Sequence, residues 1–260
     1  MGGLTVLAAL RRVLPEEQFI YLGDSARLPY GTKSPRTVTR YARQATGLLV
    51  ERGIKALVVA CNTASAFALA KLAADYDPLP VFGVLEPGAA AASAATAQGP
   101  ILVLAAESTI RGGGYQRALL TLRPEIAIYG RACPLWVTLA EQDHPNQALV
   151  DRILLDALRG FPAVGDPAGI TVLLGCTHFP VFRQRLHHLV GANAKIIDSA
   201  ATTARAVAQA LADAGLSASD TAPAARGVVQ YLATDSVQRF QRVGRLFLGE
   251  VLDQVELIDL

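Results

Sequence analysis

Two strand-length apolar runs, each ending in a cysteine, constrain the fold of this chain more than any other feature. The first run covers residues 55–60 and leads into Cys61; the second covers residues 170–175 and leads into Cys176. Short polar residues follow each cysteine at once. In an open parallel sheet, ligands bind just beyond the carboxyl ends of the strands. We therefore expect two thiols, one from each half of the chain, to face one substrate as acid and base.

The rest of the chain alternates short apolar strand patterns with helical patterns. The expected strands cover residues 19–22, 57–60, 81–84, 101–104, 126–129, 171–174, 196–197 and 228–232. The expected helices cover residues 4–14, 35–53, 64–74, 115–122, 147–158, 181–190, 202–214 and 235–248, with a further alanine-rich helix after Pro87. This alternation predicts an α/β fold with parallel sheets flanked by helices and right-handed crossovers.

The spacing of the two cysteine segments, about one small domain's length, predicts two similar α/β lobes with the active site in the cleft between them. We assign residues 1–97 together with 203–260 to the first lobe and residues 98–202 to the second. Residues 98–100 (QGP) mark the boundary, and residues 216–226 are expected to form a surface loop.

Composition narrows the class of protein. With 52% hydrophobic and 18% charged residues, the chain matches a compact globular protein. A net charge of +2 and dispersed arginines argue against nucleic acid and against an anionic membrane as partners. No apolar run approaches a membrane span and no signal-peptide pattern is present, so we expect a cytoplasmic protein. Three cysteines, an odd number, favour free thiols in a reducing compartment.

The residues around the two cysteines suit proton transfer. A thiol has an ordinary pKa of about 8.5, and a helix that began directly after the strand would stabilise its thiolate. Asn62, Thr63 and Thr177 could hold a carboxylate at such helix ends. His178 could assist proton transfer at Cys176. The cysteines lack the clustered spacing of a zinc site, so no metal is expected.

A structural explanation competes with this one. A cysteine at the end of a buried strand is often simply a small apolar residue, and a lone histidine often caps or fills a core. The repetition of strand, cysteine and small polar residues favours the functional interpretation for Cys61 and Cys176. Cys133 lacks that setting, and we assign it to the core.

Seven short motifs occur along nearly the whole chain. They are residues 23–27 (GDSAR), 29–31 (PYG), 60–64 (ACNTA), 83–88 (GVLEPG), 132–135 (ACPL), 175–180 (GCTHFP) and 197–199 (IDS). In this order and at these spacings, they resemble the motifs of the glutamate racemases within the cofactor-independent aspartate/glutamate racemase superfamily.

The resemblance implies interconversion of L- and D-glutamate by two bases, without a cofactor. One of Cys61 and Cys176 would remove the α-proton as a thiolate, and the other would protonate the opposite face as a thiol. D-Glutamate would supply bacterial peptidoglycan, and hence cell-wall biogenesis and cell shape. The family also implies a homodimer.

The resemblance assigns further site residues by motif. His178 would assist Cys176 and bind substrate, and Glu86 could line the pocket. The residues that would bind the carboxylates and amino group of glutamate are Tyr30, Gly31, Asn62, Thr63 and Thr177.

One departure from the family pattern concerns the start of the sequence. The family opens with an apolar strand and Asp-Ser-Gly ahead of the segment that is here residues 2–6 (GGLTV). That aspartate is the expected partner of the first cysteine. Either the segment is truly absent or the start has been placed too late, and we favour the second explanation. For the chain as written we expect weak or absent racemase activity.

Two alternatives remain open from the sequence. A relative of the same fold could act on aspartate, a hydantoin or another α-acidic substrate. A non-catalytic binding protein, for example a modulator of DNA gyrase, could also share the fold, although it would not require both thiols.

Overall fold

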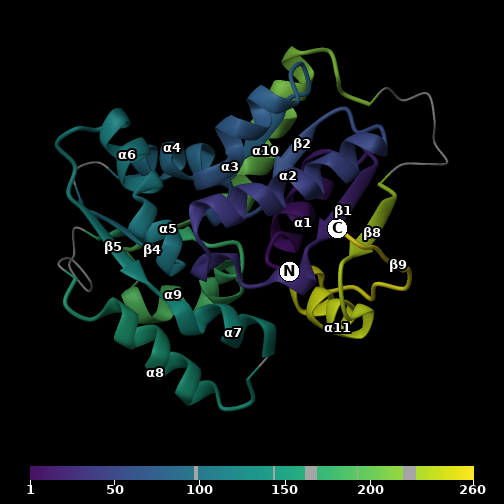
Figure 1. Ribbon diagram of the computed structural model, residues 1–260. Coiled ribbons are helices and arrows are strands. Elements are labelled where there is room, and N and C mark those ends of the chain that lie inside the picture. The colour runs from purple at the N-terminus through teal and green to yellow at the C-terminus, as the bar shows by residue number, and fades with distance from the viewer. Residues whose placement is uncertain (97–98, 143, 162–168, 192, 219–226) are drawn as a thin grey trace.

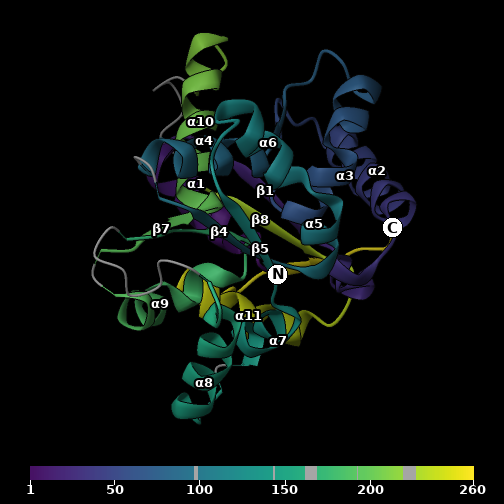
Figure 2. The same ribbon diagram turned by 90° about the vertical axis from the view of Figure 1, so that its left-hand side faces the viewer.

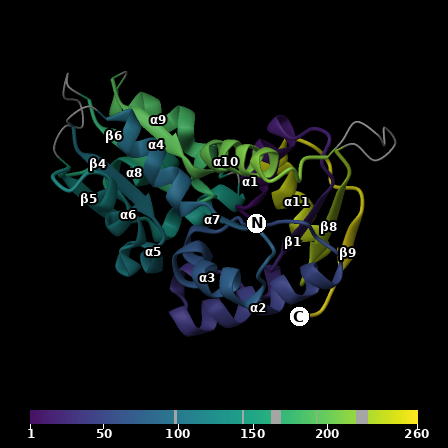
Figure 3. The same cartoon turned by 90° about the horizontal axis from the view of Figure 1, so that it is seen from above.

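The computed structural model describes residues 1–96, 99–142, 144–161, 169–191, 193–218 and 227–260. The chain forms two α/β lobes that lie side by side in Figures 1 and 3, and every strand pairing is parallel. The expected fold class is confirmed. The boundary predicted at residues 97 and 98 lies outside the described residues, as do residues 219–226 of the predicted surface loop.

The second lobe contains a four-stranded sheet in the order β5-β4-β6-β7. Its strands are β4 (Ile101–Ala105), β5 (Ile128–Ala132), β6 (Thr171–Gly175) and β7 (Lys195–Asp198). Every residue of β4 and β6 is buried, as expected for central parallel strands that are covered on both faces.

Helices cover both faces of this sheet, as Figure 2 shows. One face packs against α7 (Pro134–Gln142), α8 (Gln147–Leu158) and α9 (Arg183–Val190). The other packs against α4 (Leu85–Ala95) and α6 (Gly114–Leu122), with α5 (Glu107–Gly112) beside β4 and β5.

The strands of the first lobe form two separate parallel sheets. One has the order β1-β8-β9 and the other pairs β2 with β3. The strands are β1 (Phe19–Gly23), β2 (Leu57–Val59), β3 (Val81–Gly83), β8 (Val229–Ala233) and β9 (Val255–Leu257).

Five helices complete the first lobe and its junction with the second. They are α1 (Leu4–Val13), α2 (Pro35–Glu51), α3 (Asn62–Asp75), α10 (Ser199–Asp213) and α11 (Val237–Leu248). Helices α1 and α10 pack against each other through a cluster that includes Val6, Leu10, Ala204 and Val207, and they lie near the junction of the lobes in Figure 3.

Local sequence signals explain several helix starts. The Ser34 hydroxyl accepts a hydrogen bond from the Thr37 backbone N–H, and Pro35 occupies the first helical position of α2, as expected. Asp198 at the end of β7 caps α10 by accepting from the Ala201 N–H at 3.0 Å. No helix of the described residues is long and apolar enough to cross a membrane.

Some expected elements were wrong in position or missing. Strand β5 begins at Ile128 rather than residue 126, because Ile126 instead packs into the core below α6. The expected helix at 181–190 begins only at Arg183, after a 3₁₀ helix over Phe179–Phe182. Helices α5 and α7 and strand β9 were not predicted, because each is too short to show a clear helical or strand repeat of apolar residues.

Trp136, the only tryptophan of the chain, anchors the second lobe. Its side chain is 1% exposed, and its ring lies 4.9 Å from that of Phe179 and 5.8 Å from that of Phe182. These rings fix α7 against the turn that follows β6, which is where Cys176 lies.

We expect Trp136→Ala to lower the free energy of unfolding by about 3–5 kcal/mol, because the lost ring leaves a cavity between two phenylalanines. Urea denaturation followed by circular dichroism measures this. Leu135→Ala on the same helix is the matched control, since Leu135 is 59% exposed and should change stability little. Equal effects of the two substitutions would contradict this account of the core.

Candidate active site

One cavity of about 1350 Å³ extends from between β1 and β2 of the first lobe to the second lobe, and its wall contains every residue for which the sequence predicted a site role except Glu86. These residues are Tyr30, Gly31, Cys61, Asn62, Thr63, Cys176, Thr177 and His178. The first five come from the first lobe and the last three from the second. Glu86 does not share this position, because it is exposed in the first turn of α4.

Cys61 lies where β2 ends and α3 begins, as expected. It is the N-cap residue of α3, with an extended backbone at φ −148° and ψ 122°. Burial raises the pKa of the Cys61 thiol, while hydrogen bonds from the backbone amides of Ala64 and Thr63 act in the opposite direction. The start of α3 therefore offers its free N–H groups to a thiolate at Cys61.

The two residues after Cys61 are held from the second lobe. Tyr115 of α6 donates its hydroxyl to Asn62 Oδ1, and Thr63 Oγ1 lies 2.9 Å from Thr109 Oγ1 of α5. Asn62 is 3% exposed, and its Nδ2 has no hydrogen-bond partner within the described part of the chain. A buried donor of this kind is costly unless a bound molecule accepts from it.

Cys176 follows β6, and no α-helix begins directly after it. Residues 176–178 form a turn, and only the short 3₁₀ helix over Phe179–Phe182 follows. Pro180 lies in the first turn of that short helix, ahead of α9. The thiolate of Cys176 therefore lacks the N-terminus of a long helix as support, and its environment differs from that of Cys61.

The two thiols affect each other electrostatically. Burial raises the pKa of Cys176 to about 12, the backbone amide of His178 lowers it, and a charge on Cys61 raises it further. Because like charges in a buried site disfavour each other, one thiolate and one thiol are favoured over two thiolates. That combination provides one base and one acid in the same cavity.

The sequence predicted a role for His178 at Cys176, and in the fold His178 contacts further side chains that the sequence did not predict. His178 Nδ1 lies 3.8 Å from Cys176 Sγ, and His178 Nε2 lies 2.9 Å from Glu141 Oε1 on α7. The other oxygen of Glu141 accepts from Arg239 of α11 at 2.7 Å. Burial disfavours the carboxylate, but the hydrogen bonds from His178 and Arg239 outweigh it and lower the pKa of Glu141 to about 2.

A sequence signal for Glu141 exists, although it is weak. Residues 134–142 (PLWVTLAEQ) are mostly apolar and contain one acidic residue, which is 7% exposed in the fold. An acidic residue within an apolar helical segment indicates a buried, paired carboxylate. Burial in turn lowers the pKa of His178, while its hydrogen bond to Glu141 raises it.

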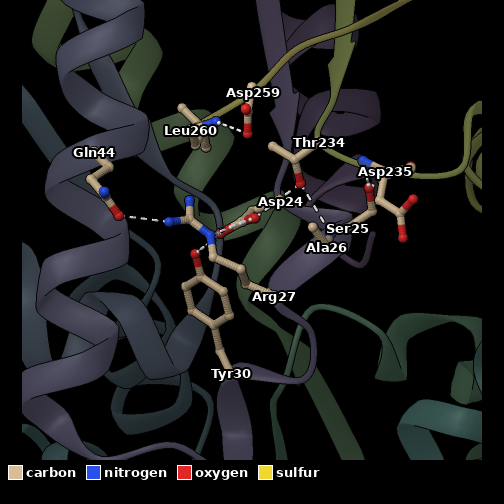
Figure 4. Close-up of polar contacts among 10 residues, drawn as sticks. All are labelled: Asp24, Ser25, Ala26, Arg27, Tyr30, Gln44, Thr234, Asp235, Asp259 and Leu260. Atoms are coloured by element: carbon tan, nitrogen blue, oxygen red, sulfur yellow. Dashed lines mark hydrogen bonds and ion pairs between the residues drawn. The ribbon is translucent and has the colours of Figure 1, made fainter.

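Tyr30 belongs to a polar cluster at the edge of the first lobe, shown in Figure 4. Its hydroxyl donates to the Asp24 carboxylate, which also accepts from Arg27 Nε at 2.7 Å and from Thr234 Oγ1 at 3.0 Å. Burial and the contact with Asp24 raise the pKa of Tyr30. The hydroxyl of Tyr30 is thus engaged with protein, and we expect the segment to contribute to the cavity mainly through its backbone.

Two glycines allow close approach between the lobes beside the cavity. A Cβ at Gly31 would lie 2.7 Å from the Cβ of Ala106, and a Cβ at Gly2 would lie 2.4 Å from His178 Nδ1. Thr5 of α1 also donates to the carbonyl of Thr177 at 2.9 Å. The Cys176 turn is therefore packed directly against the start of α1.

The remaining cysteine, Cys133, lies outside the wall of the cavity. Cys133 is 3% exposed in the core of the second lobe, where burial raises its pKa to about 12. Within the described ranges, no three His, Cys, Asp or Glu side chains are grouped so that they could hold a metal ion.

We expect Glu141→Gln to lower the free energy of unfolding by about 1–2 kcal/mol at pH 7, because an ionised acceptor for two cationic or polar donors is lost. The folded-state pKa of about 2 lies below the ordinary 4.5, so the carboxylate stabilises the fold above pH 4.5. This contribution is lost as the pH falls toward 2. Urea denaturation measures the free energy of unfolding of the unmutated protein and of Glu141→Gln. The difference between these two free energies should shrink below pH 4.5, and a difference that grew on acidification would contradict the assignment.

Comparison with known proteins agrees with the geometry. The model of the Asp/Glu/Hydantoin racemase family matches residues 4–207. A glutamate racemase of Geobacter metallireducens is 44% identical over 264 residues, which cover 100% of this chain and 94% of that protein. A glutamate racemase of Chlorobaculum tepidum is 38% identical over 261 residues, covering 99% and 93% of the two chains.

Solved structures give the same result. A glutamate racemase isoform from Bacillus anthracis superposes with a TM-score of 0.89 at 32% identity, covering 100% of this chain and 94% of the other. The Thermus thermophilus glutamate racemase, in complex with β-chloro-D-alanine, gives a TM-score of 0.85 at 37% identity, with 100% and 93% coverage. The Francisella tularensis glutamate racemase, in complex with D-glutamate, gives 0.87 at 28% identity, with 99% and 94% coverage.

Proposed function

This chain belongs to the Asp/Glu/Hydantoin racemase family, and we propose that it interconverts L- and D-glutamate through the thiols of Cys61 and Cys176. The observation that carries the proposal is the placement of the two thiols. They follow strands of opposite lobes, line one cavity, and disfavour each other's ionisation. This arrangement supports proton removal on one face of a small substrate and proton delivery on the other.

The proposed reaction starts with one cysteine as a thiolate and the other as a thiol. The thiolate takes the proton from the α-carbon, and the electron pair left behind is delocalised into the adjacent carboxylate. The thiol then donates its proton to the opposite face of the α-carbon. Each turnover exchanges the protonation states of the two cysteines, so the enzyme that has released L-glutamate is in the form that reacts with L-glutamate. The two thiols must exchange a proton with the solvent before the enzyme can react with D-glutamate again.

The polar residues beside the cysteines would hold the substrate. The unpartnered Nδ2 of Asn62 and the N-terminus of α3 supply donors for a carboxylate on the Cys61 side. Thr63 and Thr177 add hydroxyls, and Tyr30 and Gly31 close the edge of the cavity. No side chain in this proposal requires a metal or an organic cofactor.

Three wider proposals follow from the same relationship. The D-glutamate would serve peptidoglycan synthesis, the enzyme would act in the cytoplasm, and two copies would form a homodimer. Sedimentation equilibrium of the full chain tests the last proposal, for which we expect a mass of twice 27.4 kDa. A single species at 27.4 kDa across the concentration range would overturn it.

We expect Cys61→Ser and Cys176→Ser each to slow exchange of the glutamate α-proton on the order of 10²–10⁴-fold, since each removes a positioned acid or base. Mass spectrometry of glutamate incubated in D₂O measures the gain of deuterium at the α-carbon, which accumulates even at low turnover. Cys133→Ala is the matched control, because that thiol lies in the core of the second lobe.

The same measurement tests the substrate and the alternatives. Faster exchange with aspartate or another amino acid than with glutamate would overturn the assignment to glutamate. Exchange that survived in both serine variants would overturn the two-thiol mechanism.

A further inference from the structure

We propose that Arg239 of α11 is a positioning residue for Cys176. From the opposite lobe it holds the Glu141 carboxylate, and through it His178, in the place that supports the Cys176 thiolate. The inference rests on the proposed function in one respect, namely that Cys176 must ionise during turnover. Arg239 is placed outside the proton-transfer steps themselves.

A continuous series of contacts joins the two residues. Cys176 Sγ lies 3.8 Å from His178 Nδ1, His178 Nε2 lies 2.9 Å from Glu141 Oε1, and Glu141 Oε2 lies 2.7 Å from Arg239. The first three residues come from the β6 turn and α7 of the second lobe. Arg239 comes from α11 of the first lobe, 98 positions away from Glu141.

Two further contacts from α11 reach the same place. Arg242 donates to the backbone carbonyl of Glu141 at 3.2 Å, so the helix holds the main chain as well as the carboxylate. The ring of Phe247 meets the His178 ring edge-on, with centroids 5.5 Å apart. One face of α11 therefore fixes both Glu141 and His178.

The two cysteines differ in how a thiolate is supported, and this difference gives Arg239 its importance. Cys61 caps an α-helix of 14 residues, whose N–H groups favour negative charge. Cys176 is followed only by a turn and a short 3₁₀ helix. Support for its thiolate therefore depends on His178, whose backbone amide lowers the pKa of Cys176 and whose ring is held beside the sulfur by Glu141.

Arg239 is half-exposed, yet its partner is not. The Arg239 side chain is 48% exposed, whereas the Glu141 side chain is 8% exposed. An exposed ion pair alone contributes little. Here the arginine is one of two side chains that satisfy a buried carboxylate, and removing one of the two leaves that carboxylate short of a donor.

Arg239 acts on Cys176 by charge and by position. The Glu141 carboxylate raises the pKa of Cys176, and the positive charge of Arg239 beside that carboxylate opposes the effect. Without Arg239, the opposing charge is lost and Glu141 no longer holds His178 as firmly. The other charged or titratable groups that face Glu141 or His178 are Tyr21, Arg242 and the amino group of Met1.

The test is the rate at which each cysteine is alkylated by iodoacetamide, followed peptide by peptide in the full chain by mass spectrometry. Below its pKa a thiol reacts in proportion to its thiolate fraction, so the ratio of rates reports the shift in pKa. We expect Arg239→Met to slow alkylation of Cys176 about threefold, equivalent to about half a pH unit, and to leave Cys61 unchanged. Arg239→Lys should recover part of the rate.

Controls separate positioning from general damage. Arg245→Met removes the same charge from an exposed position on the same helix, and it should leave the alkylation rates of both cysteines unchanged. Glu141→Gln removes the carboxylate through which Arg239 acts, so adding Arg239→Met to Glu141→Gln should cause no further slowing of Cys176 alkylation. A second, smaller thiol reagent, methyl methanethiosulfonate, should report the same ratio, because the change is in ionisation rather than access.

Three results would overturn the proposal. Arg239→Met could leave the modification rate of Cys176 unchanged, or slow modification of both cysteines equally. It could also slow modification of Cys176 by different factors with the two reagents. Circular dichroism melting of each variant identifies a general loss of structure. The measurement needs no glutamate turnover. Failure of the proposed function would instead appear as unmutated protein that alkylates as expected yet exchanges no α-proton.

Discussion

The repulsion between two buried thiols in one cavity is the constraint on which the rest of the site depends. Burial alone raises the pKa of both cysteines, and a charge on Cys61 raises that of Cys176 further. A symmetrical pair of thiols would be inert and a pair of thiolates is disfavoured, so the state with one of each must be reachable. Each feature around the two residues can be understood as stabilising one thiolate charge, which lies on Cys61 in one half of the reaction and on Cys176 in the other.

The lobes provide this support to each other through polar contacts. Tyr115 and Thr109 of the second lobe hold the residues after Cys61, while Thr5 and Arg239 of the first lobe hold those around Cys176. Each cysteine thus lies on one lobe and is positioned in part by the other. The polar contacts across the junction of the lobes therefore help to position both thiols.

The sequence predicted the site residues that are placed by local strand patterns, and missed those that depend on contacts between distant parts of the chain. Cys61 and Cys176 could be placed because each follows an apolar strand, and ligands bind beyond the carboxyl ends of parallel strands. The missed residues, Glu141 and Arg239, meet across 98 positions of the chain. Their helices carry no periodic or capping signal that refers to the other, so only the packing of α11 on α7 brings them together.

The helix predicted at residues 181–190 is present from Arg183, but a turn and a short 3₁₀ helix separate it from Cys176, and this has a consequence for the chemistry. The motif at 175–180 resembles that at 60–64 only as far as the polar residue after the cysteine, and Pro180 then lies within a short 3₁₀ helix rather than at the start of a long one. Apolar periodicity at 181–190 predicted the later helix and could not show the turn that precedes it.

This asymmetry cannot favour one enantiomer over the other. L- and D-glutamate have equal free energies in water, so kcat/KM must be the same in both directions whatever the two cysteines contribute. A helix N-terminus at Cys61 and the His178, Glu141 and Arg239 contacts at Cys176 can change which proton transfer limits turnover, and can change kcat and KM together in one direction, but not the ratio of the two kcat/KM values. The fold therefore provides two different kinds of support for the same charge, and the equilibrium does not require them to be equal in strength.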